Sequence, residues 1–147
     1  MKIICVTGTP GVGKTKFAKQ LAKKKKLRYV PLNDILCKEG LCTSYHRSLK
    51  SYEIDVKKLR LFLRDFLQAM KKLGEGLVID SHMSHEAPPS LVDECYVLKC
   101  DINKLKRRLQ KRGYSQRKIR ENLDAEILDV CLIEAIDRGH HVKVVHR

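Results

Sequence analysis

Several features that would place the chain in another class of protein are missing from its 147 residues. No apolar run approaches the roughly 20 residues that a membrane-spanning helix needs. No signal-peptide architecture precedes the first predicted strand, so we expect a cytoplasmic protein that does not contact a membrane. The sequence shows no internal repeat, and its length fits one domain over residues 1–147 with a core of its own.

The cysteines lack the spacing that a metal site needs. No two of the six are arranged as C-x-x-C, which disfavours zinc. Cys5, Cys95 and Cys100 fall in predicted buried strands, where a thiol acts as a small apolar side chain. We therefore expect reduced thiols, as in a cytosolic protein.

Acidic residues are scarce relative to basic ones. Asp and Glu number 17 against 31 Lys and Arg, which gives a formal charge of +14. An excess of this size favours a polyanionic partner such as a nucleotide, RNA or a ribonucleoprotein surface. A highly charged surface that only keeps the protein in solution is the alternative.

One stretch carries a complete phosphate-binding pattern. Residues 8–15, Gly-Thr-Pro-Gly-Val-Gly-Lys-Thr, match G-x-x-x-x-G-K-[ST] at every fixed position. An apolar, β-branched run at 2–7 precedes it and a helical pattern at 16–26 follows it. This order predicts a strand, a loop and a helix N-terminus, whose backbone N–H groups and dipole favour an anion.

Two side chains of this loop have expected roles. Lys14 would reach the β- and γ-phosphates of a nucleotide, and the Thr15 hydroxyl would ligate Mg²⁺. The glycines permit backbone angles that bring phosphate oxygens close to the chain. The pattern therefore predicts a nucleotide-binding protein.

Strand and helix patterns alternate along the rest of the chain, which predicts an α/β fold with a five-stranded parallel sheet and helices on both faces. Residues 40–54 show no clean period, and we interpret them as an irregular, mobile surface segment. The four further strands are predicted at 27–30, 76–80, 95–98 and 142–145.

Capping residues mark three of the predicted helices. Asp55 begins a long amphipathic helix that Gly74 ends, and Asp101 begins another that Gly113 breaks. Ser115 begins the last one, in which Ile119, Leu123, Ile127 and Val130 are expected on one buried face.

An acid and a histidine follow the third predicted strand. Asp80 ends this apolar strand, where it could hold Mg²⁺ directly or through water; a turn or helix cap is the alternative. His82, two residues later, could orient an acceptor or a water, or could be a hydrogen-bonded structural residue.

Phosphoryl transfer also needs cations on the transferring group. Arg112 is the best placed, because Gly113 next to it predicts a break where a helix gives way to a flap. The alternative for any single arginine of this helix is a solvated face.

Taken together, these motifs resemble the nucleoside monophosphate kinases, and one branch in particular. Asp80-x-His82, residues 111–115 (Lys-Arg-Gly-Tyr-Ser), Asn122-Leu123 and Glu126-Ile127 resemble the adenylate kinase isoenzyme 6 type, also described as coilin-interacting nuclear ATPase in eukaryotes. The similarity runs from residue 3 to about residue 134.

The resemblance implies a short-lid adenylate kinase fold. Gly11, Gly13, Lys14, Thr15 and Lys16 would contact the phosphates of ATP, with Arg112 as the lid arginine. Thr15 and Asp80 would hold Mg²⁺, and Lys14, Asp80, His82 and Arg112 would form the catalytic set. Residues 31–54 would bind the monophosphate, and residues 111–121 would form the lid.

The resemblance also implies an activity and partners. We expect a monomer that transfers the γ-phosphoryl group of ATP to AMP, which gives two ADP, or to another nucleoside monophosphate, and that hydrolyses ATP. It would act in late maturation of the small ribosomal subunit, where it transiently binds a platform ribosomal protein on a pre-ribosomal particle. Cys37 departs from the family, since relatives often carry an arginine there, and Lys16 stands where many carry Thr or Ser.

Two rival hypotheses remain open from the residues. In one, the protein is a ribosome assembly factor that uses ATP as a timing switch, and the kinase reaction is incidental. In the other, it is a kinase for a different small metabolite.

Overall fold

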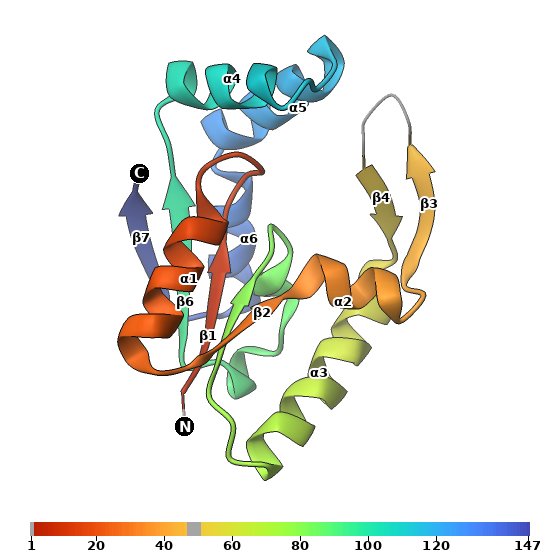
Figure 1. Ribbon diagram of the computed structural model, residues 1–147, viewed down its shortest axis with the longest axis vertical. Helices are drawn as coiled ribbons and strands as arrows, with labels where there is room; N and C mark the ends of the chain where they lie inside the picture. The colour runs from red at the N-terminus through yellow and green to blue at the C-terminus, as the bar shows by residue number, and fades with distance from the viewer. Residues whose placement is uncertain (1, 47–50) are drawn as a thin grey trace.

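The computed structural model describes residues 2–46 and 51–147. At its centre lies a five-stranded sheet in the order β2-β5-β1-β6-β7, and every neighbouring pair in it is parallel (Figure 1). The predicted α/β class and five-stranded parallel sheet are confirmed. The strands are β1 (Ile3–Thr7), β2 (Arg28–Pro31), β5 (Leu77–Asp80), β6 (Glu94–Lys99) and β7 (Val142–His146).

Helices cover both faces of the sheet, which explains why the central strands are apolar throughout. Along β1 the side chains alternate: Ile3 and Cys5 belong to one buried cluster, and Ile4 and Val6 to the other. The first cluster includes residues of α2 (Leu32–Lys38), α3 (Val56–Lys72) and α6 (Val130–Arg138), and the second includes residues of α1 (Lys14–Lys25), α4 (Ile102–Lys111) and α5 (Gln116–Ile127).

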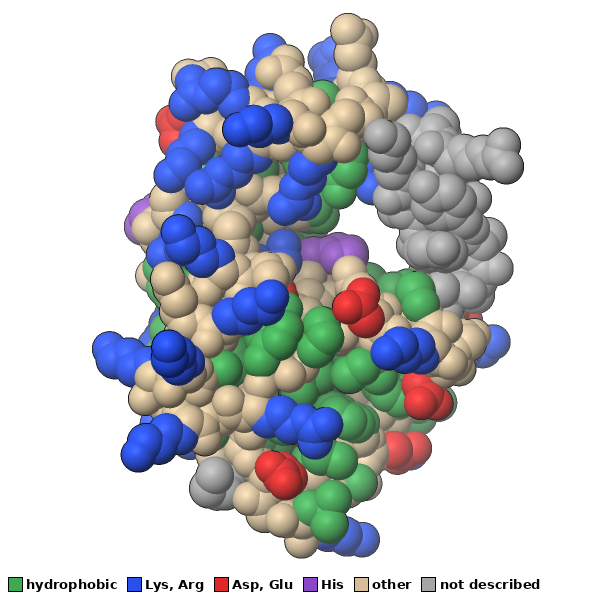
Figure 2. Space-filling model, viewed as in Figure 1, with side chains coloured by type: hydrophobic (Ala, Val, Ile, Leu, Met, Phe, Trp, Pro, Cys, Tyr) green, Lys and Arg blue, Asp and Glu red, His purple; other side chains and the backbone are tan. Residues whose placement is uncertain are grey.

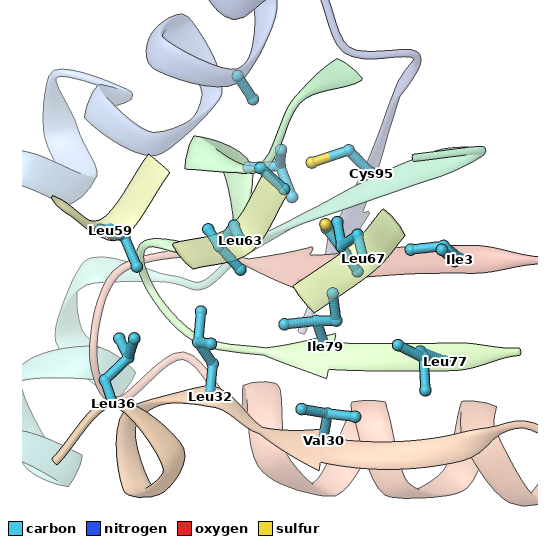
Figure 3. Packing of buried hydrophobic residues seen from close by; sticks show 14 residues of the cluster. Ile3, Val30, Leu32, Leu36, Leu59, Leu63, Leu67, Leu77, Ile79 and Cys95 are labelled. Carbon is cyan, nitrogen blue, oxygen red and sulfur yellow. The ribbon is translucent and has the colours of Figure 1, made fainter. Parts of the chain in front are cut away.

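The long helix α3 shows how sequence pattern becomes packing. Asp55 caps it by accepting hydrogen bonds from the backbone N–H groups of Lys57 and Lys58, as predicted. Leu59, Leu63 and Leu67 recur every four residues and are fully buried. Figure 3 shows them above Ile79 and Leu77 of β5, with Leu67 beside Ile3 of β1.

The segment after α2 is more regular than expected. Residues 42–46 and 51–54 form an antiparallel pair, β3 (Cys42–His46) and β4 (Ser51–Ile54), beside the main sheet (Figure 1). The expectation of an irregular segment is therefore wrong for these residues, while 47–50 lie outside the described residues. The register shifts between Cys42 and Tyr45, and such a shift breaks the alternation that would reveal a strand.

The last predicted helix is also wrong in part. Ser115 does cap α5, but the helix ends at Ile127 and α6 begins at Val130. Between them Asp129 adopts a left-handed φ of 54°. Its carboxylate lies 2.6 Å from Lys99 Nζ, which fixes the turn. Ile127, expected in the core, is 60% exposed.

The cysteines follow the expectation only partly. Cys5, Cys95, Cys100 and Cys131 are free thiols, and the first three are buried. Cys37 is in a disulfide, so the expectation of reduced thiols is wrong there. Within the described residues, 2–46 and 51–147, no helix is long and apolar enough to cross a bilayer.

We predict that Leu63→Ala lowers the free energy of unfolding by about 2–5 kcal/mol, because it opens a cavity at a fully buried position. Leu61→Ala is the matched control on the same helix, since Leu61 is 52% exposed and its loss should change stability by less than about 0.5 kcal/mol. Urea denaturation measures both. Equal effects of the two variants would contradict the packing described for α3.

Candidate active site

A large pocket opens where strands of the sheet end. Its volume is about 1500 Å³, and its lining includes residues 9–11 and 13–16, Pro31, Asp80 and His82. Figure 2 shows the hollow below the basic α4–α5 end of the molecule, with a histidine side chain on its floor. Ligands bind at this edge of open α/β sheets, since several loops converge there.

Glycine-rich backbone prepares the pocket for an anion. Gly13 is the N-cap of α1, has a left-handed φ of 100°, and offers no side-chain cap to the first turn. The N–H groups at this helix end therefore face outward for a ligand, together with the positive end of the helix dipole.

Gly11 is required by close packing as well as by its φ of 96°. A Cβ at this position would lie 3.0 Å from carbon atoms of both Leu105 and Leu109. Any larger residue would push α4 away from the loop.

Lys14 lies across the loop. Its Nζ donates to the carbonyl oxygens of Gly8 and Thr9, at 2.9 and 3.1 Å. The pKa of Lys14 falls to about 8, mainly because burial disfavours the charged form; the positive charge of Arg112 contributes to the decrease and Asp80 opposes it. A buried cation of this kind is stabilised when an anion enters the pocket.

Asp80 meets Thr15 across the sheet edge. Parallel pairing sets Asp80 beside Val6 of β1 and beside Pro31 of β2. The Thr15 hydroxyl donates to Asp80 Oδ2 at 2.9 Å, and the Tyr29 hydroxyl donates to the same oxygen at 2.7 Å. Burial and this bond to the carboxylate raise the pKa of Tyr29, so its hydroxyl stays a donor.

His82 follows Asp80 and lines the same pocket. The pKa of its imidazole falls to about 4, mainly because of burial, and the neighbouring Lys14 and His85 contribute to the decrease. The ring is therefore neutral near pH 7 and retains a nitrogen that can accept a proton.

Basic side chains enter the pocket from α4 and α5. Arg112 is the C-cap of α4 and lines the pocket, although it is exposed. Arg108 touches the loop directly, since its Nη1 donates to the Gly11 carbonyl oxygen at 3.2 Å. Lys118 is only 9% exposed, and its Nζ lies 4.4 Å from the centre of the Tyr114 ring.

The structure thus brings together the predicted residues of the loop, Asp80, His82 and Arg112 around one pocket. Lys16 lies in the first turn of α1, where it is exposed and lines the pocket. Of residues 31–54, the pocket is lined by Pro31, Asn33, Asp34, Cys37 and Ile54; of residues 111–121, it is lined by Arg112, Tyr114, Lys118 and Glu121.

Sequence reasoning did not assign the buried Glu126 a role. Its Oε1 accepts from the Thr9 hydroxyl at 3.0 Å and lies 2.9 Å from Lys99 Nζ, while Oε2 accepts from the Cys100 N–H at 2.7 Å. This carboxylate joins α5 to the glycine-rich loop and to the end of β6. Tyr29 and Lys118 were missed as well, because a strand pattern and a charged helix do not reveal which side chains converge.

Comparison with known proteins identifies the family of the chain. The family model described as "AAA domain" matches residues 4–129. A "Putative adenylate kinase" of Methanocaldococcus jannaschii is 36% identical over 144 residues, covering 98% of this chain and 77% of that protein. One of Pyrococcus furiosus is 40% identical over 140 residues, covering 95% and 72%. An "Adenylate kinase isoenzyme 6 homolog" of Schizosaccharomyces pombe is 38% identical over 132 residues, covering 90% and 73%.

The chain belongs to the adenylate kinase isoenzyme 6 family. This confirms the resemblance seen in Asp80-x-His82 and in residues 111–115. The level of identity, spread over nearly the whole chain, is what decides it.

Two solved structures of other kinases have a fold similar to that of this chain. A sugar kinase from Janibacter sp. aligns with a TM-score of 0.61 at 17% identity, over 99% of this chain and 85% of that one. A shikimate kinase from Bacteroides thetaiotaomicron aligns with a TM-score of 0.51 at 16% identity, over 96% and 85%. Both are similar to this chain in fold, which is that of the P-loop kinases.

We predict that Glu126→Ala destabilises the protein by about 1–3 kcal/mol, because it leaves the buried Thr9 hydroxyl and Cys100 N–H without their acceptor, while Lys99 keeps its pairing with Asp129. Glu121→Ala is the control on the same helix. Glu121 pairs with Arg117 on an exposed surface, and such pairs contribute about 0.5 kcal/mol or less. Chemical denaturation decides, and a small effect of Glu126→Ala would show that the buried network is not a structural tie.

Proposed function

We propose that the chain is a Mg²⁺-dependent adenylate kinase that converts ATP and AMP into two ADP. The observation that carries the proposal is the 2.9 Å contact of the Thr15 hydroxyl with the Asp80 carboxylate, in one pocket with Lys14 and His82. Phosphoryl transfer requires a phosphate cradle, a metal site, cations and an oriented acceptor. Each requirement has candidate residues here.

ATP would place its phosphates on the glycine-rich loop. Gly11, Gly13, Thr15 and Lys16 would offer backbone N–H groups, as expected for the start of α1. The Lys14 ammonium would leave the carbonyl oxygens of Gly8 and Thr9 and bind the β- and γ-phosphates. Because the ammonium is desolvated in the free protein, phosphate oxygens would restore its stabilisation.

The donor set fits Mg²⁺. Hydroxyl and carboxylate oxygens are the hard ligands that this ion prefers, and Thr15 and Asp80 present one of each at a common point. When bound, the ion would neutralise charge on the β- and γ-phosphates. Tyr29 keeps the Asp80 carboxylate in place through its own hydrogen bond.

The charge around the pocket suggests how the acceptor lies. The lining includes the basic Lys14, Arg112 and Lys118 and the acidic Asp34, Glu86 and Glu134. A phosphate group is attracted by the basic side chains and repelled by the acidic ones. An AMP molecule would therefore point its phosphate toward the cations, where the γ-phosphoryl is transferred.

Two side chains would act on the reacting groups. Arg112 would stabilise the charge that develops on the transferring phosphoryl when residues 111–121 close as a lid. The neutral His82 would orient the attacking phosphate oxygen of AMP. With AMP absent, the same imidazole could orient a water, so we propose a slow ATPase activity as well.

Product analysis with purified protein tests this proposal. With Mg-ATP and AMP, two ADP should appear for each ATP consumed, and without AMP a slower release of ADP and free phosphate should remain. Lys14→Ala should abolish both reactions, since losing charge stabilisation at the phosphates costs orders of magnitude in rate. Lys24→Ala, an exposed lysine at the far end of α1, should behave as wild type.

Two results would overturn parts of it. Unchanged turnover in Lys14→Ala would refute the role of the loop. Production of ADP and phosphate regardless of AMP would refute the kinase and leave the ATPase.

A second candidate function is favoured by the basic surface. With a formal charge of +14, the protein suits a ribonucleoprotein partner. We infer that the protein could act in small ribosomal subunit maturation through a platform ribosomal protein, with ATP as a switch.

Co-purification with pre-ribosomal particles tests the second candidate. Association that changes with ATP, that is altered by Asp80→Asn and His82→Ala, and that ignores added AMP is the expected result. Particles that carry none of the protein under any of these conditions would exclude it.

A further inference from the structure

A buried chain of hydrogen bonds runs from the pocket wall to the end of β1. Glu134, half exposed in the pocket lining, lies with its Oε2 2.8 Å from His85 Nε2. The other ring nitrogen, His85 Nδ1, lies 2.7 Å from the hydroxyl oxygen of Thr7. Thr7 is fully buried and His85 is 2% exposed. The mechanism proposed above gives Thr7 and His85 no role and gives Glu134 no part in the transfer step.

The chain ends at the backbone of the candidate catalytic histidine. The Thr7 hydroxyl also lies 3.2 Å from the carbonyl oxygen of His82, to which it can donate. A hydroxyl has a single proton to donate, so the imidazole of His85 and the carbonyl of His82 compete for it.

The protonation of His85 decides this competition. A neutral His85 with its proton on Nε2, toward Glu134, accepts the Thr7 proton at Nδ1. A His85 that carries both protons donates from Nδ1 to the Thr7 oxygen instead, and the Thr7 proton then turns to the His82 carbonyl.

We propose that Thr7, His85 and Glu134 form a positioning relay, in which the Thr7 hydroxyl, placed by the His85 ring, holds the His82 backbone in the orientation needed for phosphoryl transfer. The relay acts on the reaction put forward under Proposed function and rests on it. Glu134 fixes the His85 ring through the contact of its carboxylate with Nε2.

Other groups around the relay set its balance. On the short helix η1 (Ser84–Glu86), a carboxylate oxygen of Glu86 lies 3.8 Å from His85 Nε2 and adds to the effect of Glu134. His82 and His140 face His85 as further imidazoles; His140 Nε2 donates to the His85 carbonyl oxygen at 2.7 Å. The Cys131 thiol, 3.8 Å from the His82 carbonyl oxygen, stays protonated because burial raises its pKa.

A matched pair at position 7 separates this role from simple packing. Thr7→Val keeps the shape and removes the hydroxyl, whereas Thr7→Ser keeps the hydroxyl. We expect Thr7→Val to lower kcat at least tenfold, with the ATP dissociation constant within threefold of wild type, and Thr7→Ser to recover most of the rate. Asp65→Asn, on the exposed face of α3, serves as the neutral control.

Glu134→Gln tests the charge. The amide oxygen can still accept a hydrogen bond from His85 Nε2 but carries no negative charge, so it should hold the ring less firmly and lower kcat less than Thr7→Val does. Equal kcat in Thr7→Val, Glu134→Gln and wild type would overturn the relay. The relay would also be overturned if Thr7→Ser lost as much kcat as Thr7→Val, and if the loss in both variants simply followed a lower melting temperature.

Histidine NMR of the free protein gives a readout independent of turnover. The ring nitrogen signals of His85 should change their chemical shifts in Thr7→Val and in Glu134→Gln relative to wild type, because each variant alters a hydrogen-bond partner of one ring nitrogen. If wild type transfers no phosphoryl group but these shifts occur, the proposed function fails while the hydrogen-bonded relay stands. If transfer occurs and the shifts do not, the relay fails alone.

Discussion

The parallel pairing of β1 with β5 is the constraint on which the site depends. It sets Val6 beside Asp80, so the strand that carries the carboxylate ends level with the strand that leads into the glycine-rich loop. Only this register lets the Thr15 hydroxyl, at the start of α1, reach Asp80. A slip by one residue would turn Asp80 to the opposite face of the sheet. The burial of both faces of β1 and β5 opposes such a slip, so the hydrophobic core and the chemistry are fixed by the same pairing.

The arm formed by α4 and α5 combines a fixed base with exposed basic groups. Glu126 and Lys99 tie the end of α5 to the sheet through buried hydrogen bonds, and Leu105 and Leu109 pack α4 on the loop. Arg112, by contrast, is exposed at the turn between the two helices. A closing movement of residues 111–121 would therefore be confined to this turn, while the base of the arm keeps its contact with the loop.

Much of this arrangement can be predicted from the sequence because the signals are local. The loop at 8–15, the apolar strands and the caps Asp55, Asp101 and Ser115 are encoded by neighbouring residues, and the structure confirms each of these elements. What sequence reasoning missed depends on contacts between distant residues. The break at Asp129 is fixed by Lys99 from β6, and the β3–β4 pair is hidden by a register shift. The relay joins β1, η1 and α6, and no single stretch of sequence shows it.

The close approach of Gly11 to α4 has an evolutionary consequence. Its φ of 96° strains any residue that has a side chain, so substitution at position 11 is a costly way to compensate for changes elsewhere. Variation at Leu105 and Leu109 is then limited to side chains that fill the space against a bare backbone. In descendants of this chain, these two positions should vary together, one growing as the other shrinks. Keeping the glycine-rich loop would therefore limit which residues α4 can carry, although α4 lies about a hundred residues away in sequence.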